Sequence, residues 1–150
     1  MGLLIVRFYQ DLLAAPSAQF ADDTSKFFPT TIFDDVVLGL KDDILDDEIQ
    51  TSLFSISNNK ALGPDGFTSL FFKRSWDIVG IGFKVAVRYF IDHCILPRYV
   101  NATRISLMPK VETAYNMNDF KTISCCKVLY KCISKIIVRR LKVVLFDVIG

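Results

Sequence analysis

A regular apolar stripe in the last fifth of the sequence constrains the fold more than any other feature. Between residues 125 and 145, apolar side chains recur every three or four positions, which is the spacing of one face of an α-helix. The stripe consists of Leu129, Cys132, Ile133, Ile136, Ile137 and Leu141. We therefore predict a long helix from Cys125 to about Leu145, with this stripe facing the core.

A second face of the same helix is basic. Four cations recur every four residues and form what we call the basic ridge: Lys127, Lys131, Lys135 and Arg139. Such a ridge could follow a nucleic-acid backbone, because each neutralised phosphate adds salt-dependent affinity. The alternative interpretation is a solvated face opposite a core stripe, and it is at least as well supported by the pattern.

The rest of the sequence predicts four shorter helices. They span Leu3–Ala15, residues 46–56, about Thr68–Val79 and Val79–Cys94. In the second helix, Asp46 is suited to the N-cap position. The predicted core side chains of the second helix are Ile49, Leu53 and Ile56, and those of the third are Leu70, Phe71 and Trp76. Those of the fourth are Phe83, Val87, Phe90, Ile91 and Cys94.

A small β-hairpin is expected before the last helix. Residues 102–108 alternate well enough for a strand that Pro109 would end, and "FKTIS" at residues 120–124 could pair back as the second arm. The polar segment between them would form the turn. The predicted fold class is therefore mainly α with a small β-hairpin, an α+β chain.

Charge is distributed unevenly along the 150 residues. Residues 1–60 contain four Lys or Arg and ten Asp or Glu, a net charge of −6, whereas residues 61–150 contain fourteen and six, a net charge of +8. With 51% hydrophobic residues the chain can bury a core. We expect an N-terminal helix and acidic linker over residues 1–45, joined to a basic part over residues 46–150 that could bind a polyanion.

The spacing of the four cysteines matches neither a zinc site nor a disulfide framework. We expect reduced, buried thiols in an intracellular protein at Cys94, Cys125, Cys126 and Cys132. The two longest apolar runs lie at the N-terminus and between Val79 and Leu96. Charged residues bound or interrupt both runs, so we expect no signal peptide and no membrane partner.

The sequence Gly63-Pro64-Asp65-Gly66, which we call the corner, combines three turn-forming residue types. Proline fixes φ at the second position, the aspartate can accept a hydrogen bond from a nearby amide, and the last glycine tolerates a positive φ. We interpret the corner as a structural reversal between two helices.

Three blocks of sequence occur in a specific order: "NNKALGPDGFTSLFFKRSWDIVG", "LPRYVNATRISLMPK" and "NDFKTISCCKVLYKCISKIIVRRLK". In this order and spacing they resemble the N-terminal part of the reverse transcriptase of plant non-LTR (LINE-type) retrotransposons. The resemblance covers about residues 45–145. The sequence departs from the family pattern at Leu62, where the family usually has proline, and at Lys121-Thr122, where it usually has Arg-Pro.

This resemblance implies that the chain is a partial fingers subdomain of a right-hand, RNA-directed DNA polymerase. In the family, the hairpin arms present basic side chains to the triphosphate of the incoming nucleotide, and by position these would be Lys110 and Lys121. A compact ammonium suits a cluster of phosphates, although lysine lacks the bidentate geometry of arginine. Without the resemblance, we would interpret both as ordinary exposed lysines beside a turn.

Catalysis in this family requires clustered aspartates that hold two Mg²⁺ ions. The "FADD" sequence at Phe20–Asp23 looks like one such motif, but it precedes the corner and lies between segments that are poor strands. We interpret it as part of the linker. We therefore expect the palm and its catalytic aspartates to be missing, no cofactor in this fragment, and no nucleotide incorporation by the chain alone.

The predicted function is that of a truncated reverse transcriptase fragment that could bind an RNA template or DNA primer. The resemblance implies the nucleus or cytoplasm as its location. One alternative is a small helical module, derived from such an element, that binds nucleic acid or protein, and another is a translated relic without a role. Helix faces left exposed could also cause self-association.

Overall fold

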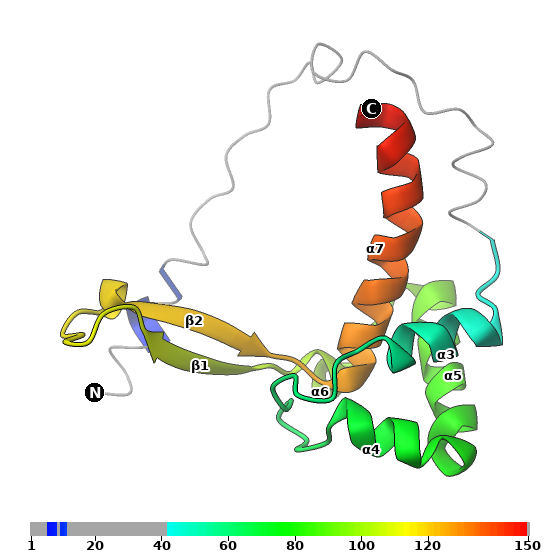
Figure 1. The fold of residues 1–150 in the computed structure, drawn as a ribbon, viewed down its shortest axis with the longest axis horizontal. Coiled ribbons are helices and arrows are strands. Elements are labelled where there is room, and N and C mark those ends of the chain that lie inside the picture. The colour runs from blue at the N-terminus through cyan, green and yellow to red at the C-terminus, as the bar shows by residue number, and fades with distance from the viewer. Residues whose placement is uncertain (1–5, 9, 12–41, 150) are drawn as a thin grey trace. The chain divides into compact units, whose positions relative to one another are not determined.

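The computed structural model describes residues 6–8, 10–11 and 42–149, which fall into two units. One unit contains the described N-terminal residues and residues 106–123, and the other contains residues 42–105 and 124–149, which we call the helical unit. Figure 1 shows the elements, which are α3 (Asp46–Phe54), α4 (Ser69–Arg74), α5 (Trp76–His93), α6 (Arg98–Asn101), β1 (Arg104–Pro109), the 3-10 helix η2 (Met117–Asp119), β2 (Phe120–Cys125) and α7 (Val128–Ile149).

The core of the helical unit lies where α3, α5 and α7 pack against one another (Figure 1). Its largest fully buried side chains are Ile49, Leu53, Val87, Cys132 and Ile136. Each large aliphatic side chain contributes about 1.5–3 kcal/mol when it is removed from water. The apolar periodicity of the sequence placed all five on core faces, and the mainly helical fold class with one small hairpin is confirmed.

The start of α3 differs from the prediction. Leu45 occupies the N-cap position without a capping side chain, and Asp46 is the first residue of the helix. The Asp46 carboxylate instead accepts hydrogen bonds from Lys84, at 2.9 Å, and from Arg88, both on α5. The prediction of Asp46 as the cap was therefore wrong, because two cations from a neighbouring helix bind the carboxylate that would have capped α3.

A second polar contact joins α7 to the segment that leads into α3. The Arg140 guanidinium donates to both carboxylate oxygens of Glu48, at 2.9 and 2.7 Å. It also donates to the backbone carbonyls of Asp42, at 2.6 Å, and Asp43, at 3.3 Å. The hydrogen bond that Arg140 donates to Glu48 is the main reason that the pKa of Arg140 is raised.

The boundary between α4 and α5 lies at Ser75 rather than at the predicted Val79. The chain leaves helical geometry at Ser75 (φ −100°, ψ 18°) and then begins α5 at Trp76. This change of direction places the Trp76 ring 5.9 Å from those of Phe54 and Phe83, measured between ring centroids. Phe71, which we expected in the core, is 39% exposed.

The C-terminus of α5 also differs from the expected pattern. Cys94 is the C-cap residue in a left-handed conformation (φ 53°), and its side chain is exposed rather than on the core face. The left-handed turn directs the chain away from the helix axis before Pro97. The expectation of four buried thiols was wrong at Cys94, and Cys126 is half-buried, whereas Cys125 and Cys132 are buried.

The helix α7 begins at Val128, three residues later than predicted. Among the side chains of α7 that the structure describes, Ile136 is the last that is fully buried, and Ile137 and Leu141 beyond it are 38% and 40% exposed. The apolar stripe therefore continues past the surface that α3 and α5 bury.

The strands β1 and β2 form a two-stranded hairpin, close to the predicted positions. A capping box supports its turn: the Asn116 and Asp119 side chains each accept a hydrogen bond from the other's backbone amide. In the predicted N-terminal helix, residues 6–8 and 10–11 are helical. The remainder of that helix and the linker before residue 42 lie outside the described residues.

Replacement of Asp46 tests the ion-pair cluster through the pH dependence of stability. The hydrogen bond from Lys84, followed by the hydrogen bond and charge of Arg88, lowers the pKa of Asp46. A lowered folded-state pKa stabilises the fold above the unfolded-state pKa, about 3.9, and this stabilisation is lost as the pH falls through the folded-state value. Asp46→Asn should therefore lower the urea midpoint at neutral pH, and its difference from wild type should vanish in strong acid.

The matched control is Asp47→Asn, which neutralises an exposed carboxylate in the same first turn. It should change the midpoint less than Asp46→Asn at neutral pH. A difference between wild type and Asp46→Asn that persists unchanged at pH values below both pKa values would contradict the role of the charge.

The thiols should differ strongly in reactivity. Burial raises the pKa of Cys132 to about 12, and its Sγ lies 3.7 Å from the Ile49 carbonyl, whereas Cys94 is exposed. Since the thiolate is the reactive form, a maleimide should label Cys94 in the native protein and Cys132 only after unfolding in urea. Mass spectrometry of the digested protein measures both rates, and equal native rates would refute the burial of Cys132.

Candidate nucleic-acid interface

The corner forms a hydrogen-bonded turn in the helical unit. The Gly66 amide donates to the Gly63 carbonyl at 3.1 Å, and the Phe67 amide donates to the Asp65 carboxylate at 3.3 Å. Gly66 has a φ of +76°, which a residue with a side chain adopts only at a cost. Because the Asp65 carboxylate accepts a hydrogen bond within the turn, we interpret Asp65 as a structural residue.

The corner lies directly against the start of α7. A Cβ atom added to Gly63 would be 2.7 Å from the Cα and 2.8 Å from the backbone nitrogen of Lys127. Lys131, one turn further along α7, donates a hydrogen bond to the carbonyl of Ala61. The absence of a side chain at Gly63 therefore allows two backbones to pack together, which the turn signals in the sequence did not reveal.

The two hairpin lysines share one face of the two-stranded sheet. The Lys110 amide donates to the Asp119 carbonyl at 2.7 Å, which pairs residue 110 with residue 119. The two six-residue strands continue this register and place Lys121 opposite Met108, two residues from Lys110 and on the same face. Cβ atoms of such diagonal neighbours are about 7–8 Å apart.

The ammonium groups of this pair differ in their contacts. Lys110 Nζ donates to the Asn118 carbonyl at 2.8 Å, which uses one of its three donors. The side chain of Lys121 is exposed. The Asp119 carboxylate, opposite Lys110, accepts from the amides of Tyr115 and Asn116 at 3.1 and 2.8 Å. The Asp119 carboxylate is therefore hydrogen-bonded to backbone amides of the turn.

The basic ridge of α7 is divided by its contacts. Lys131 donates to Ala61, as described above, and Lys135 Nζ donates to the carbonyl and hydroxyl oxygens of Ser55, at 3.0 and 2.7 Å. Lys127 Nζ lies 5.5 Å from the centre of the Tyr99 ring, while Arg139 is exposed. The two central lysines thus bind carbonyls at the end of α3 and before the corner, and a role in nucleic-acid binding stays a prediction for all four.

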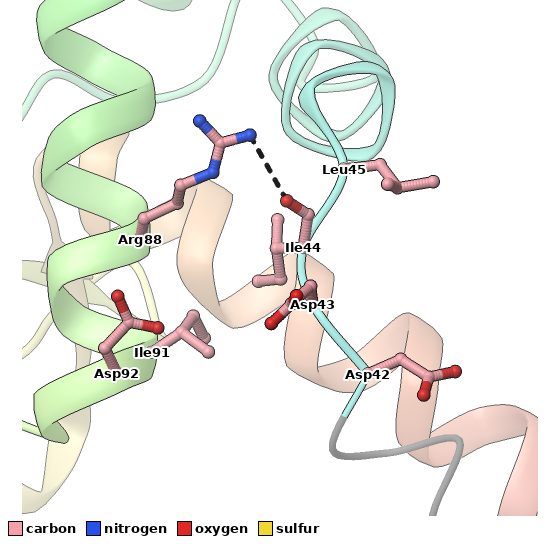
Figure 2. A pocket seen from close by; sticks show the side chains of 7 residues that line it. All are labelled: Asp42, Asp43, Ile44, Leu45, Arg88, Ile91 and Asp92. Atoms are coloured by element: carbon pink, nitrogen blue, oxygen red, sulfur yellow. Dashed lines mark hydrogen bonds between the residues drawn. The ribbon is translucent and has the colours of Figure 1, made fainter.

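A pocket of about 510 Å³ lies between α5 and the segment before α3 (Figure 2). Figure 2 shows Arg88 extending from α5 toward the Ile44 carbonyl, to which it donates at 3.4 Å. The residues that line the pocket are Asp42, Asp43, Ile44, Leu45, Arg88, Ile91 and Asp92. Its three carboxylates outnumber its single guanidinium, which also binds Asp46, so the local charge does not favour a phosphate.

Groups that could hold a metal ion were sought within residues 6–8, 10–11 and 42–149. No three His, Cys, Asp or Glu side chains gather there in a suitable cluster. Asp22 and Asp23, interpreted above as part of the linker, lie outside the described residues. Among the helices in the described part of the chain, none is both long and apolar enough to cross a membrane.

Comparison with known proteins finds no family model that matches the sequence. Part of the chain is similar to the 149 kDa protein of transposon TX1 from Xenopus laevis, with 32% identity over 103 residues. It is also similar to a retrovirus-related Pol polyprotein of the type-1 retrotransposable element R2 from Bradysia coprophila, with 31% identity over 85 residues.

These matches cover 69% and 56% of this chain but only 8% and 9% of the respective relatives. The chain thus spans less than a tenth of the length of the curated relatives that it matches. One relative is a transposon protein and the other is a Pol polyprotein of a retrotransposable element, so the similarity supports a retrotransposon origin for this chain.

The close backbone packing at the corner predicts a large effect of adding one methyl group. Gly63→Ala should lower the free energy of unfolding by about 1–3 kcal/mol, because the atoms it meets are backbone atoms that cannot rotate away. Urea unfolding followed by circular dichroism measures this effect.

The control is Gly82→Ala on α5, where an added Cβ meets nothing within 4 Å. Alanine is favoured over glycine in a helix by about 0.5–1 kcal/mol, so this variant should be as stable as wild type or more stable. If Gly63→Ala were equally well tolerated, the packing of the corner against α7 would be contradicted.

Proposed function

We propose that the chain forms part of the fingers of a non-LTR retrotransposon reverse transcriptase. In this role the hairpin would bind the phosphates of an incoming nucleotide, and the basic half of the chain would contact the nucleic-acid strand. The observation that carries the proposal is the hairpin register, which puts Lys110 and Lys121 on one face. The similarity to a transposon protein and to a Pol polyprotein of a retrotransposable element supports the same origin.

The hairpin has the chemistry that a triphosphate site requires. A nucleoside triphosphate carries several negative charges within a short distance, and two ammonium groups on one face can bind neighbouring phosphates. The capping box at Asn116 and Asp119 holds the turn that joins the arms. Because Lys110 retains two donors and Lys121 is exposed, both can bind a ligand without breaking the sheet.

The proposal assigns no catalytic step to the described residues. The family's reaction uses Mg²⁺ ions held by palm aspartates, and the described carboxylates do not fit that role: Asp65 and Asp119 accept hydrogen bonds from amides in their own turns. Asp46 and Glu48 bind cations of the same chain. Catalysis would therefore depend on residues other than these.

A second candidate function is that of a helical nucleic-acid-binding module derived from such an element. The observation that favours it is the charge of α7 and its flanks, since residues 120–149 contain seven Lys or Arg and one Asp. This module would bind the backbone of a strand and would not require a nucleotide at the hairpin.

Binding of a fluorescent deoxynucleoside triphosphate, measured by anisotropy, tests the hairpin site. The double variant Lys110→Gln/Lys121→Gln should weaken binding at least tenfold, because each charge-assisted hydrogen bond is worth about 1.5–3 kcal/mol. Unlabelled triphosphate should compete with the probe, and the corresponding nucleoside should not. Binding should also weaken as salt is raised.

The control is Lys60→Gln, which removes an exposed lysine from the helical unit and should leave triphosphate binding within twofold of wild type. Equal triphosphate binding by wild type and the double variant would show that the hairpin lysines do not bind the triphosphate. Binding of single-stranded RNA without any triphosphate binding would favour the module instead.

A further inference from the structure

A groove of about 360 Å³ lies in the helical unit between α5, α6 and the start of α7. It is distinct from the acidic pocket of Figure 2, and none of the residues that line it is acidic. Its walls include Phe90, Leu96, Pro97, Val100 and Leu129. A volume of this size is at the small end of the range for ligand sites and suits a single flat ring system.

Two tyrosines line the groove and remain exposed. Tyr99 is 70% exposed and Tyr89 is 46% exposed, although both belong to a residue type that usually buries its ring. The Tyr89 ring stacks on His93, with 4.3 Å between ring centroids and 18° between planes. Tyr99 has a cation near its ring, the Lys127 ammonium at 5.5 Å. The groove thus offers aromatic surfaces on which a planar ligand can stack.

The chain around the groove is positively charged. Arg98 precedes Tyr99 on α6 and is exposed, and Lys127 lies beside the ring. Between residues 94 and 105, which belong to the helical unit, the sequence contains two arginines but no Asp or Glu. A ligand that combines a planar ring with a nearby anion fits this arrangement better than a purely apolar side chain does.

We infer that this groove binds an unpaired nucleobase of single-stranded RNA, stacked on Tyr99. The adjoining phosphate would lie toward Arg98 and Lys127. Aromatic stacking combined with cations along the backbone is how proteins bind single strands without reading their sequence. The inference rests on the proposed nucleic-acid-binding function and adds a specific site to it, away from the sequence positions of the hairpin lysines.

The test is anisotropy of a labelled ten-nucleotide single-stranded RNA with the full chain. Tyr99→Ala should weaken binding about tenfold, whereas Tyr99→Phe, which keeps the ring, should stay within twofold of wild type. Lys127→Gln should weaken binding and reduce its dependence on salt concentration. Thermal unfolding monitored by circular dichroism establishes that each variant is folded, and the 70% exposure of Tyr99 means that its loss should be tolerated.

The outcomes separate this site from the proposed function. If the RNA binds wild type and Tyr99→Ala equally, the stacking site is refuted while nucleic-acid binding stands. If the RNA does not bind at low salt, both the stacking site and nucleic-acid binding by the chain are refuted. The triphosphate assay then tests the hairpin site separately.

A third outcome concerns a protein partner. The exposed side chains of Ile78, Ile81 and Val85 continue along α5 toward the groove. If Tyr99→Ala abolishes self-association in analytical ultracentrifugation and leaves RNA binding unchanged, the groove is a contact between copies of the chain and the inference is overturned. Ile81→Ser is the matched control, since it lies outside the groove lining and should not alter RNA binding.

Discussion

The close approach of Gly63 to the backbone of Lys127 determines how the helical unit is assembled. Residue 63 belongs to the turn between α3 and α4, while residue 127 lies between the hairpin and α7. Because two backbones meet there without an intervening side chain, the turn packs directly against the short segment that joins β2 to α7. Lys131 and Lys135 extend this contact by binding carbonyls from the preceding segments. Part of the basic ridge, which the sequence suggested as a surface for nucleic acid, therefore makes hydrogen bonds within the chain.

The sequence predicted those features that depend on local periodicity. Most core positions of α3, α5 and α7 and the two arms of the hairpin follow from the spacing of apolar residues, and the structure confirms them, except that Cys94, Ile137 and Leu141 are exposed. The errors occurred where a distant residue decides the outcome. Asp46 binds two cations of α5 instead of capping its own helix, and α5 begins at Trp76, whose ring packs against Phe54 and Phe83. The exposed end of the α7 stripe depends on how far the neighbouring helices extend.

The candidate site was predictable to a different degree in each of its parts. Lys110 and Lys121 came from the resemblance of the sequence to a family, and only the strand register places them on one face. The tyrosines of the groove, ten residues apart on different helices, carry no sequence pattern that would have joined them. Their proximity arises from the left-handed turn at Cys94, which brings α6 back beside α5. A signal was nevertheless present in the acid-free stretch between residues 94 and 105.

The contacts of Arg140 have a consequence for the segment that leads into α3. One guanidinium holds two carboxylate oxygens of Glu48 and the carbonyls of Asp42 and Asp43, so this segment lies at a fixed place along α7. A planar guanidinium has five N–H donors and can serve several such acceptors together. At position 140 the shape of the guanidinium therefore matters more than its charge. Its hydrogen bonds join the segment before α3 to a helix nearly one hundred residues further along the chain.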